Sequence, residues 1–224
     1  MSRLKEIFYS KDNRLITKCD HYLEAYERHF SKFCNTNVNV LEIGVYKGGS
    51  LQMWKKYFGD KSNIFGIDIM KKCKKLEEDR IKIFVGDQSN RDFLRSVLKE
   101  IPKIDVVIDD GGHMSNQQIN SFDEIYPNIS ENGVYLCEDL CTSYWRKYGG
   151  GFKKPDTFIE YSKNFIDYIN AWHSKSKELE VNNFTKSTNS IHYYDSMLFI
   201  EKRKKEKMVL INNKRIMKGG KLND

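Results

Sequence analysis

Two short acidic blocks carry the strongest chemical signal in this sequence. The first is Asp109-Asp110-Gly111-Gly112-His113, and the second is Glu138-Asp139. A set of carboxylate oxygens with no thiolate in it suits a hard cation such as Mg²⁺, which usually keeps waters and accepts substrate oxygens at its remaining positions. Several carboxylates gathered without a cation would repel one another. If the fold brings the two blocks together, we expect a divalent-metal site there.

His113 follows Asp110 by three residues and can exchange a proton near neutral pH. Next to a metal site, it is placed to act as the general base that takes the proton of an acceptor hydroxyl. The alternative is a histidine that caps the following helix or bonds to a neighbouring acid. Its position beside the acidic blocks favours the base.

A glycine-rich turn, Gly44-Val45-Tyr46-Lys47-Gly48-Gly49-Ser50, lies between an apolar stretch and a helical one. Such a turn suits a nucleotide-like ligand, because glycine lets the backbone approach closely and the helix start offers free N–H groups. The spacing is not the GxGxxG of pyrophosphate sites, and Glu42 stands two residues before the first glycine. That acid would repel a pyrophosphate but can pair with the ammonium of an amino-acid-bearing cofactor. The pattern favours S-adenosylmethionine (SAM) over NAD.

Two further acids, Asp68 and Asp87, end apolar stretches in the same way. A carboxylate at the first position can accept hydrogen bonds from both ribose hydroxyls, and one at the second can accept from an adenine amino group. A single aspartate at a strand end is more often a turn former or a helix cap. Three acids at successive strand ends are less easily explained in that way.

The elements that must position these residues alternate between strands and helices. Parallel strands need connections of helix length, so the pattern predicts an α/β fold with a doubly wound, Rossmann-like, mainly parallel seven-stranded sheet. Ligands bind such sheets at the carboxyl ends of the strands, where the acids lie. A C-terminal antiparallel hairpin is expected at 188–203, with one continuous strand as the alternative. We expect strands at 38–43, 63–68, 81–87, 104–110 and 133–139, and helices at 50–58, 90–100, 115–126 and 156–173.

Composition indicates one packed domain with a basic tail. A hydrophobic fraction of 39% and an aromatic fraction of 13% over 224 residues argue against disorder. We expect a single domain at 1–203, of which 1–37 form an N-terminal helical cap, and a basic tail at 204–224. The segment 201–224 holds nine Lys/Arg against three acids and so supplies most of the formal charge of +7. The body is nearly neutral, and the charge therefore does not indicate a nucleic-acid partner; the tail is either solvated or attracts an anionic partner.

The number and spacing of the cysteines and the short length of the apolar stretches both favour the cytoplasm. The five cysteines are an odd number without CxxC or paired Cys/His spacing, which is typical of a reducing environment. No apolar stretch is long enough for a signal peptide at the start or for a bilayer span elsewhere. We expect a cytoplasmic protein without a membrane span.

Across 38–145 the sequence resembles class I SAM-dependent methyltransferases, and within them the metal-dependent sugar O-methyltransferases of the macrocin and mycinamicin type. A stretch at 18–30 and the segment Tyr193-Tyr194-Asp195-Ser196 also resemble that family. The family usually has Ser where Gly112 stands, and this chain is shorter than relatives that carry a larger N-terminal extension. The similarity is carried by blocks at 41–45, 66–68, 86–89, 108–113 and 138–145.

The resemblance implies transfer of the SAM methyl group to a sugar hydroxyl. It further implies that Mg²⁺ or another divalent cation is held by Asp110, Glu138 and Asp139, with His113 as the base. The acceptor would be a nucleotide-linked sugar, a glycan or a glycosylated metabolite, and a homo-oligomer is compatible with the sequence. The expected cofactor-binding residues are Glu42, Gly44, Tyr46, Gly48, Ser50, Asp68, Asp87, Gln88 and Asp109.

Two other functions stay open. The sequence also resembles cephalosporin hydroxylases, which share the Asp-Gly-x-His and Glu-Asp blocks, but an oxygenase metal usually takes more nitrogen ligands than one histidine. The second alternative is a non-catalytic binding module that keeps the fold and acts through the basic tail. The aromatic residues Tyr144, Trp145 and Tyr148 are candidates for the walls of an acceptor pocket, with a place in the buried core as the alternative.

Overall fold

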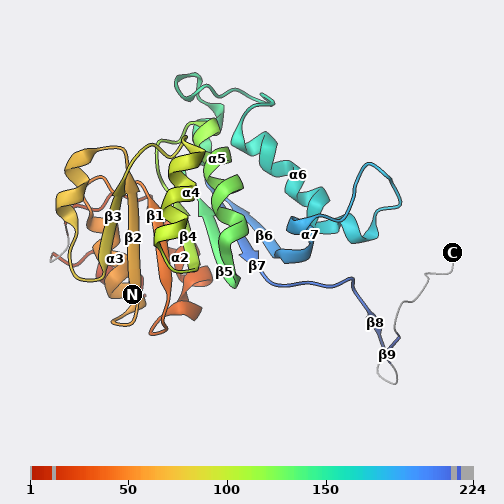
Figure 1. Cartoon of the computed structure of the whole chain (residues 1–224), viewed down its shortest axis with the longest axis horizontal. Coiled ribbons are helices and arrows are strands. Elements are labelled where there is room, and N and C mark those ends of the chain that lie inside the picture. The colour runs from red at the N-terminus through yellow and green to blue at the C-terminus, as the bar shows by residue number, and fades with distance from the viewer. Residues whose placement is uncertain (1, 12–13, 213–215, 218–224) are drawn as a thin grey trace.

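Seven strands form one sheet in the order β3-β2-β1-β4-β5-β7-β6 (Figure 1). The computed structural model describes residues 2–11, 14–212 and 216–217. Strands β1 to β5 pair in parallel, whereas β7 is antiparallel to both of its neighbours. The predicted fold class and the C-terminal hairpin are thus confirmed. The strands are β1 (Asn39–Ile43), β2 (Asn63–Asp68), β3 (Ile81–Val85), β4 (Ile104–Asp109), β5 (Ile129–Cys137), β6 (Thr188–Tyr194) and β7 (Met197–Lys202).

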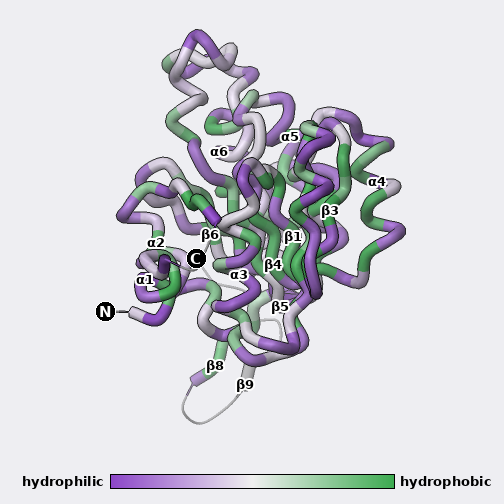
Figure 2. Tube along the Cα trace, turned by 90° about the vertical axis from the view of Figure 1, so that its left-hand side faces the viewer, coloured by the Kyte–Doolittle hydropathy of each residue, from purple (hydrophilic) through white to green (hydrophobic). Residues whose placement is uncertain are grey.

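Helices cover both faces of the sheet. Successive strand residues point to opposite faces, and apolar residues at both positions need helices to pack against. Val40 packs with the first helical layer, and its neighbour Leu41 packs with the second. Figure 2 shows hydrophobic colour along the central strands between the two layers. One layer holds α1 (Arg3–Phe8), α2 (Tyr22–Phe30) and α3 (Gly49–Phe58); the other holds α4 (Arg91–Glu100), α5 (Ser115–Ile125), α6 (Phe158–Asn170) and α7 (Asn183–Ser187).

Local sequence explains where several helices begin. The Asn90 side chain accepts a hydrogen bond from the Phe93 N–H at 3.1 Å and so caps α4. Thr157 caps α6 through the Glu160 N–H at 3.4 Å. Short 3₁₀ turns occupy several connections: η1 (Ser31–Phe33), η2 (Lys71–Leu76), η3 (Tyr126–Asn128), η4 (Leu140–Tyr144), η5 (Arg146–Tyr148) and η6 (Ala171–His173).

The fifth strand differs from its prediction at both ends. It begins at Ile129, before the expected residue 133, and ends at Cys137, so Glu138 and Asp139 lie just beyond it. The polar residues 130–132 interrupt the apolar pattern, so the sequence does not indicate the early start. Residues 131 and 132 are exposed, and the pairing with β4 is irregular next to them. Likewise β3 ends at Val85 and β4 at Asp109. The acids therefore lie at the strand ends or in the loops that follow.

After β7 the chain leaves the sheet and forms a small pair of strands, β8 (Leu210–Ile211) and β9 (Ile216–Met217) (Figure 1). Of the basic tail expected at 204–224, residues 213–215 and 218–224 lie outside the described residues. All five cysteines fall within the described ranges and are free thiols. Within those ranges no helix combines the length and the apolar character that crossing a bilayer requires.

Candidate active site

A cavity of about 400 Å³ opens at the carboxyl ends of β1, β2 and β4. Its walls come from the glycine-rich turn after β1, the end of β2, the loop after β4 and the segment 15–18 before α2. These segments are far apart in the sequence, and the parallel sheet brings them to one edge. The cavity has the size and position expected for a nucleotide-like cofactor.

Asp68 shapes the glycine-rich turn. Its Oδ2 accepts hydrogen bonds from the backbone N–H groups of Val45 and Tyr46 at 3.0 and 2.9 Å. Gly44 adopts a φ of +97°, and a Cβ at that position would collide with the carbonyl group of Asp110. The turn after β1 and the loop after β4 are therefore in backbone contact, which only glycine permits here.

Glu42 lies beneath this turn and is fully buried. Its carboxylate accepts hydrogen bonds from Ser50 Oγ at 2.7 Å and from Trp54 Nε1 at 3.2 Å, and the Lys18 ammonium lies 3.7 Å away. Burial raises the pKa of Glu42 to about 7, against the opposing effect of the Lys18 charge. Ser50, which lines the cavity, connects Glu42 to the cofactor side.

Asp109 is buried at the end of β4 and positions the neighbouring loop. It accepts hydrogen bonds from Gln88 Nε2 at 3.1 Å and from the Tyr135 hydroxyl at 3.2 Å. Burial raises the pKa of Asp109 to about 7, although both hydrogen bonds lower it. Gln88 in turn accepts a hydrogen bond from the Gly112 N–H at 2.7 Å through its Oε1. Asp109 and Gln88 thus fix the course of the loop that carries His113.

The structure brings some of the expected cofactor residues to the cavity and leaves others behind it. Within the described part of the chain, Glu42, Gly48, Asp87 and Asp109 are not part of the cavity wall. Asp87 accepts a hydrogen bond from the Ser89 N–H at 2.8 Å, the turn-forming role that the sequence left as its alternative. Expected residues that do line the cavity are Gly44, Tyr46, Ser50, Asp68 and Gln88.

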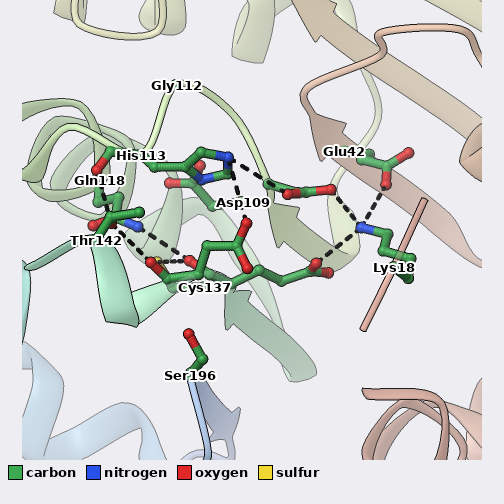
Figure 3. Close-up of polar contacts among 12 residues, drawn as sticks. Lys18, Glu42, Asp109, Gly112, His113, Gln118, Cys137, Thr142 and Ser196 are labelled. Atoms are coloured by element: carbon green, nitrogen blue, oxygen red, sulfur yellow. Dashed lines mark hydrogen bonds and ion pairs between the residues drawn. The ribbon is translucent and has the colours of Figure 1, made fainter. Parts of the chain in front are cut away.

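Asp110, His113 and Asp139 form the open side of the acidic cluster. Figure 3 shows dashed contacts that run from the His113 ring to neighbouring carboxylates. His113 Nε2 lies 3.5 Å from Asp139 Oδ2 and 4.0 Å from Asp110 Oδ1. His113 and Asp139 have φ angles of +59° and +53°, in the left-handed region that few residues other than glycine adopt and that histidine and aspartate adopt more often than most. His113 Nδ1 is buried and has no hydrogen-bond partner among the described residues. The left-handed backbone at both positions thus accompanies side chains that face each other across 3.5 Å.

Glu138 lies on the buried side of the cluster, next to Lys18. Its Oε1 accepts a hydrogen bond from the Tyr26 hydroxyl at 2.8 Å, and its Oε2 accepts one from Lys18 Nζ at 2.9 Å. Burial raises the pKa of Glu138 to about 8, against the opposing effect of Lys18. Lys18 Nζ also donates to Asp110 Oδ2 at 2.5 Å. Asp110 therefore faces Lys18 with one oxygen and His113 with the other.

The open side of the cluster fits a divalent cation. One donor atom from each of Asp110, His113 and Asp139 lies within 4.8 Å of the other two. Two carboxylate oxygens and one imidazole nitrogen form a donor set that Mg²⁺ or Mn²⁺ accepts. Of the predicted ligands, Asp110 and Asp139 belong to this set. The oxygens of Glu138, the third predicted ligand, accept hydrogen bonds from Tyr26 and Lys18, and a His113 nitrogen is the third donor atom near the two aspartates.

The sequence did not predict that Lys18 and two tyrosines complete the cluster. The side chain of Lys18 is 2% exposed, and Tyr26 is fully buried. The Tyr22 hydroxyl donates a hydrogen bond to Asp139 Oδ1 at 2.8 Å. The signal that could have found them is the 18–30 stretch, which resembles the family pattern and holds all three.

The segment before Lys18 forms one wall of the cavity and is held in place by Arg14. The Arg14 backbone N–H donates to Gln52 Oε1 at 3.0 Å, and its guanidinium group donates to the Leu76 carbonyl at 2.9 Å. An ion pair with Glu78 at 3.3 Å adds to these contacts. These contacts fix the segment that precedes Lys18, and so they position the Lys18 side chain next to the acids.

Three aromatic side chains follow Glu138 and Asp139 in the sequence, and they extend from the side of His113 to the surface. Tyr144 and Trp145 are 50% and 52% exposed, so the alternative of a place in the buried core is wrong for both. The Tyr148 ring is half-buried, and its centroid lies 6.3 Å from that of His113. Exposed aromatic rings beside a polar site are suited to contacts with a bound acceptor.

Comparison with known proteins identifies relatives over most of the chain. No family model matches the sequence. The chain is 36% identical over 191 residues to the 8-demethyl-8-alpha-L-rhamnosyl tetracenomycin-C 2'-O-methyltransferase of Streptomyces olivaceus, which covers 81% of this chain and 50% of the relative. It is 35% identical over 188 residues to the mycinamicin VI 2''-O-methyltransferase of Micromonospora griseorubida, over 79% of this chain and 47% of the relative. The chain thus spans about half the length of these curated relatives.

A solved structure gives the same picture. The MycE methyltransferase of the mycinamycin biosynthetic pathway, in complex with Mg, SAH and mycinamycin VI, superimposes with a TM-score of 0.79 at 31% sequence identity. The match covers 91% of this chain and 53% of MycE.

Proposed function

Because this chain has the class I methyltransferase fold and is homologous to the macrocin- and mycinamicin-type sugar O-methyltransferases, we propose that it transfers the SAM methyl group to a sugar hydroxyl. The observation that carries the proposal is that Asp110 and His113 belong both to the cavity wall and to the cation cluster. A cofactor in the cavity would thus hold its methyl group beside the base.

The acceptor that we propose is a nucleotide-linked sugar, a glycan or a glycosylated metabolite. The names of the relatives support a glycosylated acceptor, since they refer to rhamnosyl tetracenomycin-C and to mycinamicin VI. The exposed rings of Tyr144 and Trp145 are suited to stack on the faces of sugar rings, and Trp145 lies beside Tyr148, the ring next to His113.

His113 is proposed as the base. Its Nε2 points toward the same space as the carboxylates of Asp110 and Asp139, which would stabilise the imidazolium formed when it takes the hydroxyl proton. The acceptor oxygen then forms a bond to the methyl carbon as the carbon–sulfur bond breaks, and the sulfonium charge is lost. The Thr142 hydroxyl donates to the His113 carbonyl at 3.1 Å and helps to hold this backbone.

A divalent cation, when bound by Asp110 and Asp139, supplies positive charge that lowers the pKa of the acceptor hydroxyl. Glu138 is the third proposed ligand, so that the His113 imidazole keeps its lone pair for the proton of the acceptor. Asp68, Gln88 and the glycine-rich turn are proposed to hold the SAM nucleoside.

The test is a methyl-transfer assay with SAM, Mg²⁺ and a panel of sugar and glycoside acceptors, repeated with EDTA. The proposal predicts transfer that disappears with EDTA and returns with excess Mg²⁺. Transfer that is insensitive to EDTA would contradict the metal-assisted reaction. A binding module would give no transfer under any condition, and an oxygenase would consume O₂ with Fe²⁺ and leave SAM unchanged.

A further inference from the structure

A lysine ammonium lies where the acidic cluster is most buried. Lys18 Nζ contacts Asp110 Oδ2 at 2.5 Å and Glu138 Oε2 at 2.9 Å, and it lies 3.7 Å from Glu42 Oε1. In Figure 3 the Lys18 amine is the meeting point of three dashed contacts, one of which runs to Glu42. The Lys18 side chain is 2% exposed, so its ammonium is enclosed by these three carboxylates rather than by water.

We propose that Lys18 is the resident counter-ion of the acidic cluster, and that a divalent cation binds to Asp110 and Glu138 by displacing it. The proposal rests on the cation site of the proposed function. It assigns to Lys18 the role of setting the affinity for the cation. This role does not depend on a contact between Lys18 and the acceptor.

The hydrogen bonds of the cluster carry this inference. One oxygen of Asp110 and one oxygen of Glu138 are occupied by Lys18, and the other oxygen of Glu138 is occupied by Tyr26. A cation bound between Asp110 Oδ2 and Glu138 Oε2 would occupy the point where the Lys18 ammonium lies, and would therefore displace it. A cation that stayed on the open side would lie near the Lys18 ammonium, which shares Asp110 with it, and the two positive charges would repel each other.

The same contacts give the acids a counter-ion that belongs to the chain itself. Buried carboxylates in one cluster would repel one another without a positive charge among them. Lys18 supplies that charge from an anchored segment, since Arg14 binds Gln52, Leu76 and Glu78. Lys18 and the divalent cation are thus alternative counter-ions for one set of acids.

The first test is calorimetric titration with Mn²⁺ alone on the wild-type chain and on Lys18→Met, which keeps the length of the side chain and removes its charge. Lys82→Met is the matched control, because Lys82 pairs with Glu100 on the surface and its loss changes the net charge equally. We expect Lys18→Met to bind Mn²⁺ at least about tenfold more tightly and the control to stay within about twofold of the wild type. Unchanged or weaker binding by Lys18→Met would overturn the proposal.

The second test uses the wild-type chain and so does not depend on how well the variant folds. Surface amines are acetylated with an N-hydroxysuccinimide ester with and without saturating Mg²⁺, and the rate at Lys18 is followed by mass spectrometry relative to Lys82. We expect Lys18 to be protected without Mg²⁺ and to react several-fold faster with it. Equal protection in both conditions would refute displacement. Neither test measures methyl transfer. A protein that gives both expected results but transfers no methyl group would therefore contradict the proposed function and leave the displacement of Lys18 supported.

Discussion

Asp109 gives a pH dependence of stability whose sign and size follow from its burial. The carboxyl group is 1% exposed, and its pKa is raised from 3.8 to about 7. Between these pH values the folded state keeps a proton that the unfolded state has released, so the free energy of unfolding falls as pH rises. The difference of about three pKa units corresponds to a loss of up to about 4 kcal/mol, complete above about pH 7.

Asp109→Asn should remove this contribution while keeping a side chain of the same shape. Its amide oxygen can accept from Gln88 or Tyr135, but not all present hydrogen bonds can be kept, so we expect a lower stability at pH 5. Between pH 5 and 6.5 the stability of the variant should fall less steeply than that of the wild type, by about 1.4 kcal/mol per pH unit. Glu42 and Glu138, whose pKa values are also raised, keep the remaining slope in both proteins.

The measurement is urea-induced unfolding at half-unit steps from pH 5 to pH 8, without divalent cations. Asp105→Asn, on the same strand but only half-buried, is the matched control and should keep the wild-type slope. If the curves of Asp109→Asn and the wild type run parallel over this range, the reasoning from burial to protonation is refuted.

Two further changes test how the site is built. Tyr26→Phe leaves the buried Glu138 Oε1 without its hydroxyl donor, so the free energy of unfolding should fall by about 1–3 kcal/mol in urea titrations. Tyr9→Phe, at an exposed ring, is the control. Equal losses in both variants would contradict the importance of the Tyr26–Glu138 hydrogen bond. Gly44→Ala would force a Cβ into the Asp110 carbonyl at a φ of +97°, and calorimetry should show at least about a tenfold loss of S-adenosylhomocysteine affinity. Gly151→Ala, which meets only the Lys154 side chain, should bind normally, and wild-type affinity in Gly44→Ala would show that the turn tolerates a side chain.

Much of this fold is predictable because its strands are short, apolar and separated by helical segments. The strand predicted at 63–68 has those bounds in the structure, and the C-terminal hairpin turns at the predicted Asp195-Ser196. The fifth strand begins at Ile129, before its predicted start at residue 133, and the polar residues 130–132 explain the difference because they interrupt the apolar pattern. The hydrophobic pattern predicts a strand well where all of its residues are buried. It misses the part of a strand whose residues are paired but exposed to solvent.

The site was predicted in position but not in its contacts. Asp109 and Asp110 are adjacent, yet only Asp110 lines the cavity, while Asp109 is buried between Gln88 and Tyr135. Side chains alternate between opposite directions near a strand end, so a strand-end position alone does not say which acid faces the ligand. Lys18 lies 92 and 120 residues before its partners Asp110 and Glu138, and no local pattern indicates a pairing over that distance.

The most direct test of the central claim is the rate of methyl transfer by His113→Asn, measured with saturating SAM, Mg²⁺ and an acceptor found with the panel. Asparagine tolerates the left-handed φ of +59° at this position, so the backbone is expected to keep its course. The account predicts that the chemical step slows by about 10²–10⁴-fold, while calorimetry shows S-adenosylhomocysteine affinity within about twofold of the wild type. Wild-type turnover by His113→Asn would contradict the account.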